Sequence, residues 1–214
     1  MNRNQSILFA FLAVSLSFFA ATADKEKNVL IIGDSISIGY TPYVTTALAP
    51  DILVTHNPGN GGSTRRGVDS MEVWLNHKKW DLITFNFGLH DMIYKDDQNK
   101  NDVANGKVAV PLDEYRKNLE SIVARLKKST KVLLFVNTTV VPENSSGRKV
   151  EDPARYNEVA MEVMKNNHIP VIDLYTASLV IHPKTSKPGN VHYSPEGYEL
   201  LAAELIKSIK EALK

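Results

Sequence analysis

Four polar segments of the sequence hold the side chains best suited to chemistry. Gly33-Asp34-Ser35 ends an apolar run, residues 57–64 (NPGNGGST) and 88–91 (GLHD) follow two more, and residues 191–195 (VHYSP) lie near the C-terminus. A serine hydroxyl, a glycine-rich backbone and two histidines are components of an acyl-transfer site. In such a site the hydroxyl attacks a carbonyl, an imidazole accepts its proton, and N–H groups stabilise the oxyanion.

Ser35 is expected at a strand-to-helix turn, with its hydroxyl exposed and its N–H at the helix N-terminus. The amide and the positive end of the helix dipole there favour negative charge on an attacked carbonyl. Taken alone, Gly-Asp-Ser is a common turn sequence. The glycines of residues 59–62 and His192, which precedes the last predicted helix, make a nucleophile the better interpretation of Ser35.

The elements that must position these residues alternate between short apolar runs and amphipathic stretches, as in an α/β protein with a mostly parallel sheet. Five strands rich in β-branched residues are predicted at Asn28–Gly33, Ile52–His56, Asp81–Phe87, Lys131–Asn137 and Pro170–Leu174. Because ligands bind beyond the carboxyl ends of such strands, polar segments that follow strands should share one edge of the sheet.

Helices fill the intervals, and the clearest predictions are Leu112–Lys128, Ala154–Asn166 and Pro195–Leu213. The first should bury Leu119, Ile122, Val123 and Leu126. The last should begin with Ser194 as its cap and bury Leu200, Leu201, Leu205, Ile206 and Ile209. Three long loops are expected to shape a pocket beyond the strand ends, at Gly88–Val110, Thr138–Asp152 and Thr176–Tyr193.

Composition limits the class of protein. The chain has 214 residues, 43% of them hydrophobic, which suits one globular domain with a core. The 25 Lys and Arg residues nearly balance the 24 Asp and Glu residues, so nothing in the net charge favours a nucleic-acid partner. Because the chain has no cysteine, it can form no disulfide, thiolate nucleophile, cysteine-ligated metal or cysteine-linked lipid anchor.

The N-terminus has the pattern of a secretory signal peptide. Its apolar run from Ile7 to Ala21 is shorter than the ~20 residues that a membrane-spanning helix needs, and Ala21-Thr22-Ala23 suits a cleavage site. We therefore expect a signal peptide at residues 1–23, a mature domain at 24–214, and a secreted or periplasmic protein without stable membrane insertion. An uncleaved membrane anchor is the alternative.

The four segments, in this order, resemble the SGNH (GDSL-type) hydrolases, a family of esterases, lipases, thioesterases and carbohydrate deacetylases. The resemblance covers the whole mature chain and implies a three-layer, flavodoxin-like α/β/α sandwich with about five parallel strands. It implies that Ser35 is the nucleophile and an oxyanion donor, that Gly62 donates a backbone N–H to the oxyanion, and that His192 is the general base. It implies no cofactor and no metal.

Two positions depart from the family pattern. His90 stands where the family has an oxyanion-binding asparagine; a neutral imidazole can replace that donor if an acceptor at its other nitrogen holds the tautomer. The acid of the triad normally lies three residues before the histidine, where this chain has Gly189. Asn190, a backbone carbonyl or Asp173 could orient His192 instead, and a Ser–His dyad relying on a carbonyl is the simplest hypothesis.

These observations favour the hypothesis that the protein is an esterase acting on small acyl groups, acetyl foremost, plausibly on carbohydrates. A lysophospholipase or thioesterase of the same family is one alternative, and a catalytically silent binding module is another. A metal site formed by His90, Asp91 and His192 would leave Ser35 and Gly62 without a purpose. A flavodoxin-like cofactor protein would place a phosphate near Ser35. Neither the natural substrate nor the oligomeric state follows from the sequence.

Overall fold

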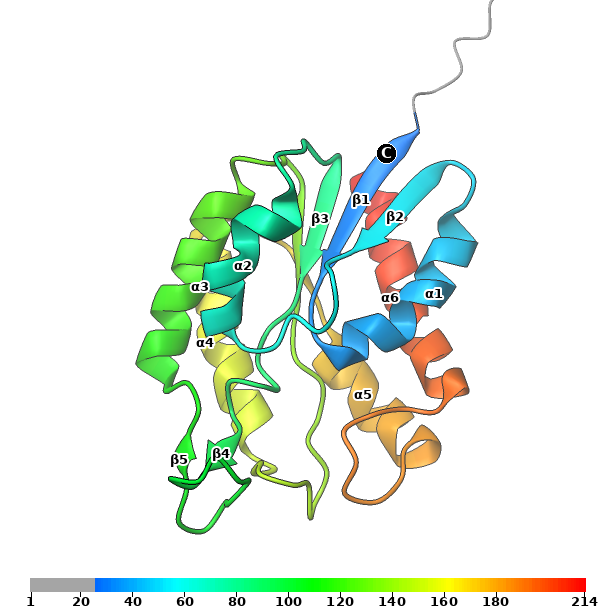
Figure 1. The fold of residues 1–214 in the computed structure, drawn as a ribbon. Helices are drawn as coiled ribbons and strands as arrows, with labels where there is room; N and C mark the ends of the chain where they lie inside the picture. Colours follow the sequence, from blue (N-terminus) through cyan, green and yellow to red (C-terminus); the bar gives the residue numbers. More distant parts are fainter. Residues whose placement is uncertain (1–25) are drawn as a thin grey trace, which may run out of the picture.

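The computed structural model describes residues 26–214, so the predicted signal peptide at residues 1–23 lies outside the described part of the chain. Its main sheet has five parallel strands in the order β2-β1-β3-β6-β7, which confirms the predicted fold class (Figure 1). The strands are β1 (Lys27–Ile32), β2 (Ile52–His56), β3 (Leu82–Phe85), β6 (Leu133–Val136) and β7 (Val171–Ile172). Each lies within or next to the range expected from its apolar run.

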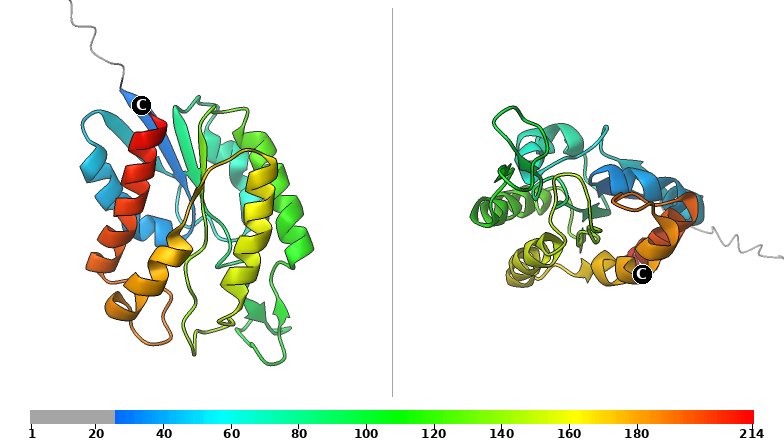
Figure 2. Two further views of the ribbon diagram at one scale, coloured as in Figure 1. Left: turned by 180° about the vertical axis from the view of Figure 1, so that it is seen from behind. Right: turned by 90° about the horizontal axis from the view of Figure 1, so that it is seen from below.

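Six helices of the described chain cover both faces of this sheet, as the views from behind and from below show (Figure 2). The first, fifth and sixth lie on one face, and they are α1 (Ser35–Leu48), α5 (Leu174–Thr185) and α6 (Pro195–Ala212). The other face carries α2 (Thr64–Leu75), α3 (Leu112–Leu126) and α4 (Asp152–Asn166). A two-stranded hairpin of β4 (Tyr94–Lys95) and β5 (Lys107–Val108) projects from the predicted loop 88–110.

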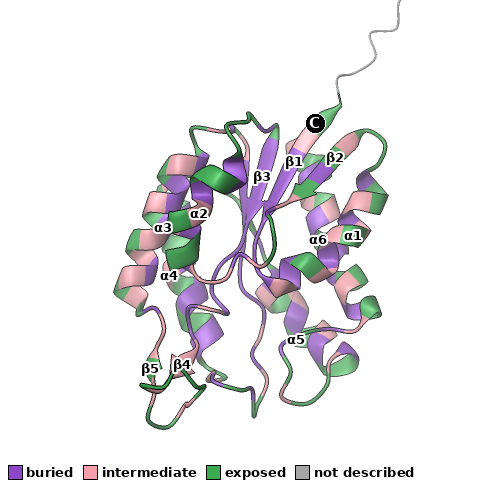
Figure 3. Cartoon of the chain, viewed as in Figure 1, coloured by how far each residue is buried: buried purple, intermediate pink, exposed green. Residues whose placement is uncertain are grey.

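Burial explains why the central strands consist almost entirely of apolar residues, with Thr84 of β3 as the exception. All four residues of β3 and all four of β6 are buried, because helices cover both sides of these strands (Figure 3). The edge strand β2 instead alternates, with Leu53 47% exposed and Val54 buried. On α3 the predicted stripe is confirmed, since Leu119, Ile122 and their two partners Val123 and Leu126 are buried.

Two predictions about the C-terminal third were wrong. Residues 174–185 form α5, although a loop was expected from Thr176. Its side chains show no apolar stripe, since Leu179 and Val180 stay exposed, and Pro183 lies inside the helix near its C-terminal end. On α6 the predicted Leu200 is 46% exposed and Ile206 is only partly buried, because the buried stripe runs through Leu201, Leu205 and Ile209, with Ala202 beside it.

The strand order places the topological switch point of the sheet beside β1. This strand pairs with β2 on one side and with β3 on the other, so the chain reverses its direction of winding there. Ligands of open α/β sheets bind at such a point, beyond the carboxyl ends of the strands. Ser35 follows β1 and His90 follows β3, so the fold delivers both residues to this edge of the sheet.

Candidate active site

Ser35 is the first residue of α1, in a turn fixed by its neighbours. The Asp34 carboxylate caps the helix by accepting the Ile36 N–H at 2.9 Å, and the Gly33 N–H donates to the Asn57 side chain at 2.8 Å. The Gly61 N–H donates to the Gly33 carbonyl at 2.8 Å, and a Cβ on Gly61 would lie 2.5 Å from that oxygen. Only glycine therefore allows the second polar segment to approach the Ser35 turn so closely.

The Ser35 hydroxyl meets the ring of His192. Ser35 Oγ and His192 Nε2 are 2.8 Å apart and hydrogen-bonded, although 157 positions separate the two residues in sequence. Ser194 caps α6 by accepting the Gly197 N–H, and Ser186 Oγ donates to the His192 carbonyl at 2.6 Å. The loop that carries His192 is thus anchored on both sides, with the ring exposed to solvent. This is the geometry in which an imidazole can remove a proton from a serine hydroxyl.

Asn190 orients the His192 ring. Its Oδ1 accepts from the His192 backbone N–H at 3.0 Å and lies 2.9 Å from His192 Nδ1. A carboxamide oxygen can only accept, so it favours the tautomer with the proton on Nδ1 and leaves Nε2 free to accept from Ser35. The Asn190 carbonyl in turn is hydrogen-bonded to the buried ring of His182 at 2.7 Å. His182 therefore holds the loop without touching Ser35.

The other two candidates for this role have different partners. Asp173 accepts from the Asn137 side chain at 2.8 Å and from Thr176, at the start of α5. No backbone carbonyl of the described chain bonds to the His192 ring, so of the three groups considered from the sequence, the structure places Asn190 there.

Backbone geometry explains why position 189 holds no acid. Gly189 has φ +69°, in the left-handed region that favours glycine. A Cβ at this position would also lie 2.9 Å from the Asn144 carbonyl oxygen. An aspartate at 189 would therefore be strained, and the polar group that orients His192 comes from the next residue instead.

We expect Asn190→Ala to lower kcat/KM about tenfold, since one hydrogen bond contributes about 1 to 1.5 kcal/mol. Asn190→Asp should raise kcat/KM above the wild-type value, because a carboxylate makes the stronger bond to an imidazole that gains a proton. Gly189→Asp is the matched control, expected to lower stability without any gain in rate. Steady-state hydrolysis of an acetate ester measures all three. A loss of activity in Asn190→Asp as large as in Asn190→Ala would contradict the orienting role.

The two backbone N–H groups expected to bind the oxyanion, those of Ser35 and Gly62, differ in whether they are free to donate. Among the described residues the Ser35 N–H has no acceptor, as expected at the first turn of a helix. The Gly62 N–H, at a glycine with φ +66°, instead donates to Asn60 Oδ1 at 2.8 Å. A substrate oxygen would have to replace the Asn60 oxygen before Gly62 could donate to it.

His90 lies on the third polar segment, partly buried beside the Ser35–His192 pair. Burial lowers the pKa of its imidazole, and Arg148, the neighbouring His192 and Lys95 lower it further, whereas Asp34 opposes the shift. The ring is therefore neutral at pH 7 and offers one N–H donor. Within residues 26–214 no hydrogen bond to either ring nitrogen is found, so the acceptor expected to hold its tautomer is not seen.

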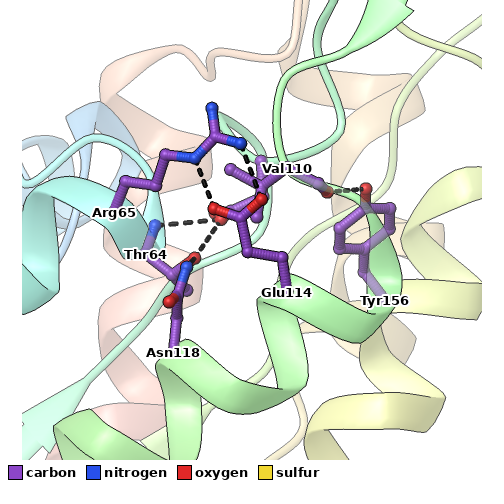
Figure 4. Close-up of polar contacts among 7 residues, drawn as sticks. Thr64, Arg65, Val110, Glu114, Asn118 and Tyr156 are labelled. Carbon is purple, nitrogen blue, oxygen red and sulfur yellow. Dashed lines mark hydrogen bonds and ion pairs between the residues drawn. The ribbon is translucent and has the colours of Figure 1, made fainter.

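Asp91 braces the second and third polar segments against each other. Its Oδ1 accepts from the Thr64 N–H at 2.9 Å and from the Thr64 hydroxyl at 2.5 Å, and Asn118 donates to that hydroxyl at 3.0 Å (Figure 4). Nearby, Arg65 pairs with Glu114 on the surface. Burial raises the pKa of the Asp91 carboxyl to about 7, since its bonds to Thr64 compensate only in part.

This raised pKa predicts how stability depends on pH. The unfolded chain releases the Asp91 proton near pH 4, whereas the folded protein keeps it to about pH 7, so ionisation opposes folding progressively across this window. Asp91→Asn keeps the Oδ1 acceptor and removes the titration. We therefore expect the free energy of unfolding of Asp91→Asn, relative to wild type, to increase between pH 4 and pH 7. Chemical denaturation across that range measures it, and a constant difference would contradict it.

Sequence reasoning missed several residues of this site. Asn60, Asn57 and Arg148 have no motif of their own, and each acts through a contact with a residue distant in sequence or with a loop amide. The only signal was their position in segments that follow strands. His182 has a structural role, because it is buried and bonded to the Asn190 carbonyl.

Two further findings on the described residues concern metal-binding clusters and membrane-spanning helices. No group of three His, Asp or Glu residues in residues 26–214 is placed to hold a metal ion. In the same residues no helix is both long and apolar enough to cross a membrane.

Solved structures of similar fold include several esterases. A lipase/acylhydrolase from Enterococcus faecalis is 23% identical, with a TM-score of 0.72, 88% of this chain covered and 97% of that one. Axe2, an acetylxylan esterase from Geobacillus stearothermophilus, is 21% identical, with a TM-score of 0.71 and coverage of 86% and 94%. The acetyl xylan esterase AlAXEase is 17% identical, with a TM-score of 0.70 and coverage of 85% and 99%. A comparison with curated proteins finds no match.

The sequence profile of the GDSL-like lipase/acylhydrolase family matches residues 31–200, which include Ser35, Gly62, His90 and His192. The fold and the order of the polar segments agree with this match. The chain therefore belongs to the GDSL-like lipase/acylhydrolase family and is an ester hydrolase.

Proposed function

We propose that this protein removes small acyl groups, acetyl foremost, from carbohydrate esters through a Ser–His acyl-enzyme mechanism. The observation that carries the proposal is the 2.8 Å bond between Ser35 Oγ and His192 Nε2, with Asn190 on the far side of the ring. The acetylxylan esterases of similar fold support the substrate class.

In the first half of the reaction, Ser35 Oγ attacks the ester carbonyl carbon while His192 Nε2 takes the hydroxyl proton. The carbonyl oxygen becomes an oxyanion that accepts from the Ser35 N–H, from the His90 ring, and from the Gly62 N–H once it has displaced Asn60. Collapse of this intermediate breaks the bond to the leaving alcohol, which receives the proton from His192.

In the second half, water replaces the alcohol. His192 takes a proton from water as the water oxygen attacks the acyl-enzyme, and a second oxyanion forms in the same place. Its collapse releases the carboxylic acid and returns the proton to Ser35 Oγ. The negative charge of the oxyanion is stabilised in both halves by the first turn of α1.

The side chains around the dyad favour a small polar substrate. Asn60, His90, Arg148 and Asn190 all carry polar groups, whereas a long acyl chain needs a contiguous apolar groove. A cavity of about 580 Å³ between α4 and β7 does have apolar lining, including Met161 and Val171, but neither Ser35 nor His192 lines it.

A chain-length series of p-nitrophenyl esters tests the acyl preference. We expect the highest kcat/KM with acetate and a steady decline toward octanoate, with Ser35→Ala as the inactive control. Release of acetate from acetylated xylo-oligosaccharides then tests the carbohydrate. A maximum at octanoate or a longer chain would instead support a lysophospholipase or thioesterase.

Two specific observations favour a silent binding module as the alternative. The Gly62 N–H is already occupied by Asn60, and His192 is oriented by an amide rather than by a carboxylate. This alternative predicts affinity for an acetylated carbohydrate with no turnover of any ester in the series.

A further inference from the structure

Arg148 reaches the third polar segment from a different part of the chain. It lies between β6 and α4, and its Nε donates to the Leu89 carbonyl at 2.7 Å, one residue before His90. The turn that carries it is itself anchored, since the Tyr94 N–H donates to the Gly147 carbonyl at 2.7 Å. Gly147 has φ +71°, and a Cβ there would lie 2.8 Å from the Asn101 side chain. The guanidinium is thus delivered to the His90 loop by a fixed backbone.

The charge of Arg148 is not neutralised by a partner. In residues 26–214 no carboxylate lies within ion-pair distance of this guanidinium, whereas Arg65, Arg116 and Arg155 each have one. Arg148 is partly buried, and burial lowers its pKa while Asp34 raises it. An arginine remains protonated under these conditions, so a permanent positive charge stands near the His90 ring.

Four charged or titratable groups face His90. Asp34 favours the protonated ring, and Arg148, His192 and Lys95 favour the neutral ring. Arg148 also donates a hydrogen bond to the residue directly before His90.

The neutral form suits the first step of the proposed reaction. His192 becomes positively charged when it accepts the Ser35 proton, and a protonated His90 beside it would oppose that step. A neutral imidazole can still donate one N–H without this repulsion.

We propose that Arg148 is a positioning residue for His90, which fixes the adjacent Leu89 carbonyl and holds the ring in its neutral, N–H-donating form. The charge of Arg148 acts on the His90 ring, and its hydrogen bond fixes the Leu89 carbonyl. A lysine at this position would keep the positive charge but lose the geometry of the hydrogen bond, so Arg148→Lys separates the two contributions. The inference deepens the proposed esterase function and rests on it for its catalytic consequence, but its electrostatic part can be measured without any substrate.

An NMR titration of the histidine side chains measures the electrostatic part, with the His90 signal assigned from its absence in His90→Asn. We expect the His90 midpoint to rise by about one pH unit in Arg148→Gln and to stay near the wild-type value in Arg148→Lys. Arg116→Gln, on the surface of α3, is the matched control and should leave it unchanged. An identical midpoint in wild type and Arg148→Gln would overturn the proposal. If Arg148→Gln fails to fold, Arg148→Lys provides the test instead. A His90 midpoint that is higher in Arg148→Lys than in wild type would then overturn the proposal.

The pH dependence of kcat/KM tests the consequence. Arg148→Gln should lose several-fold more activity at pH 5.5 than at pH 8, and this difference should vanish when His90→Asn is already present. The same difference in the His90→Asn background would show that Arg148 acts through His192, and would overturn the proposal. An enzyme inactive on every ester, whose His90 midpoint nevertheless rises in Arg148→Gln, would refute the proposed function but leave the placement of Arg148 intact.

Discussion

Replacing His192 with alanine is expected to lower kcat/KM for an acetate ester by about 10⁴-fold or more. In enzymes with this mechanism the serine and the histidine act as a unit, so the loss of one removes most of the rate that the pair provides. Here Nε2 is the only imidazole nitrogen of the described chain bonded to Ser35 Oγ. Steady-state kinetics with p-nitrophenyl acetate and with an alkyl acetate measure the effect.

The two substrates separate the roles of the ring. A nitrophenolate leaves without a proton, whereas an alkoxide needs the proton that His192 returns, so the loss should be greater with the alkyl acetate. His77→Asn is the matched control, because His77 is exposed beyond the C-terminal end of α2 and has φ 52°, which asparagine tolerates. A loss of less than about tenfold in His192→Ala would remove His192 from the mechanism.

Replacing His90 with alanine is expected to lower kcat by about 10² to 10³, which is the usual effect of removing one oxyanion donor. His90→Asn should retain much of the wild-type rate, since a carboxamide also supplies a neutral N–H donor. The ratio of kcat between His90→Asn and His90→Ala is the decisive quantity. Both variants remove the imidazole, but only His90→Ala removes the N–H donor.

Stability can be separated from this effect. His90 is partly buried and makes no hydrogen bond within the described residues. Neither variant should therefore change the free energy of unfolding by as much as His90→Ala changes the activation free energy of the reaction. Chemical denaturation beside the kinetics checks this point. Equal rates in wild type and His90→Ala, with both proteins folded, would exclude His90 as an oxyanion donor.

The parts of this account that follow from the sequence depend on local patterns. A buried parallel strand is mostly apolar, and a helix start has its own cap, so the strands and the position of Ser35 could be predicted from short stretches. The meeting of Ser35 and His192 required one further step, the order of the four polar segments along the chain.

The parts that could not be predicted depend on backbone conformation and on long-range contacts. The choice of Asn190 over Asp173 follows from where the loop after α5 turns, and the left-handed conformation of Gly189 has no unambiguous signature in sequence. The bond from Arg148 to Leu89 joins two loops 59 positions apart. The occupied N–H of Gly62 depends on the conformation of one side chain, Asn60.

Reaction with a fluorophosphonate, followed by mass spectrometry of the intact protein and of its peptides, tests most directly whether the Ser35 hydroxyl is an activated nucleophile. The account predicts one label per chain, located on Ser35, absent from Ser35→Ala, greatly slowed in His192→Ala and unchanged in Ser208→Ala on the surface of α6. A label on another residue, or equal labelling of wild type and Ser35→Ala, would contradict it.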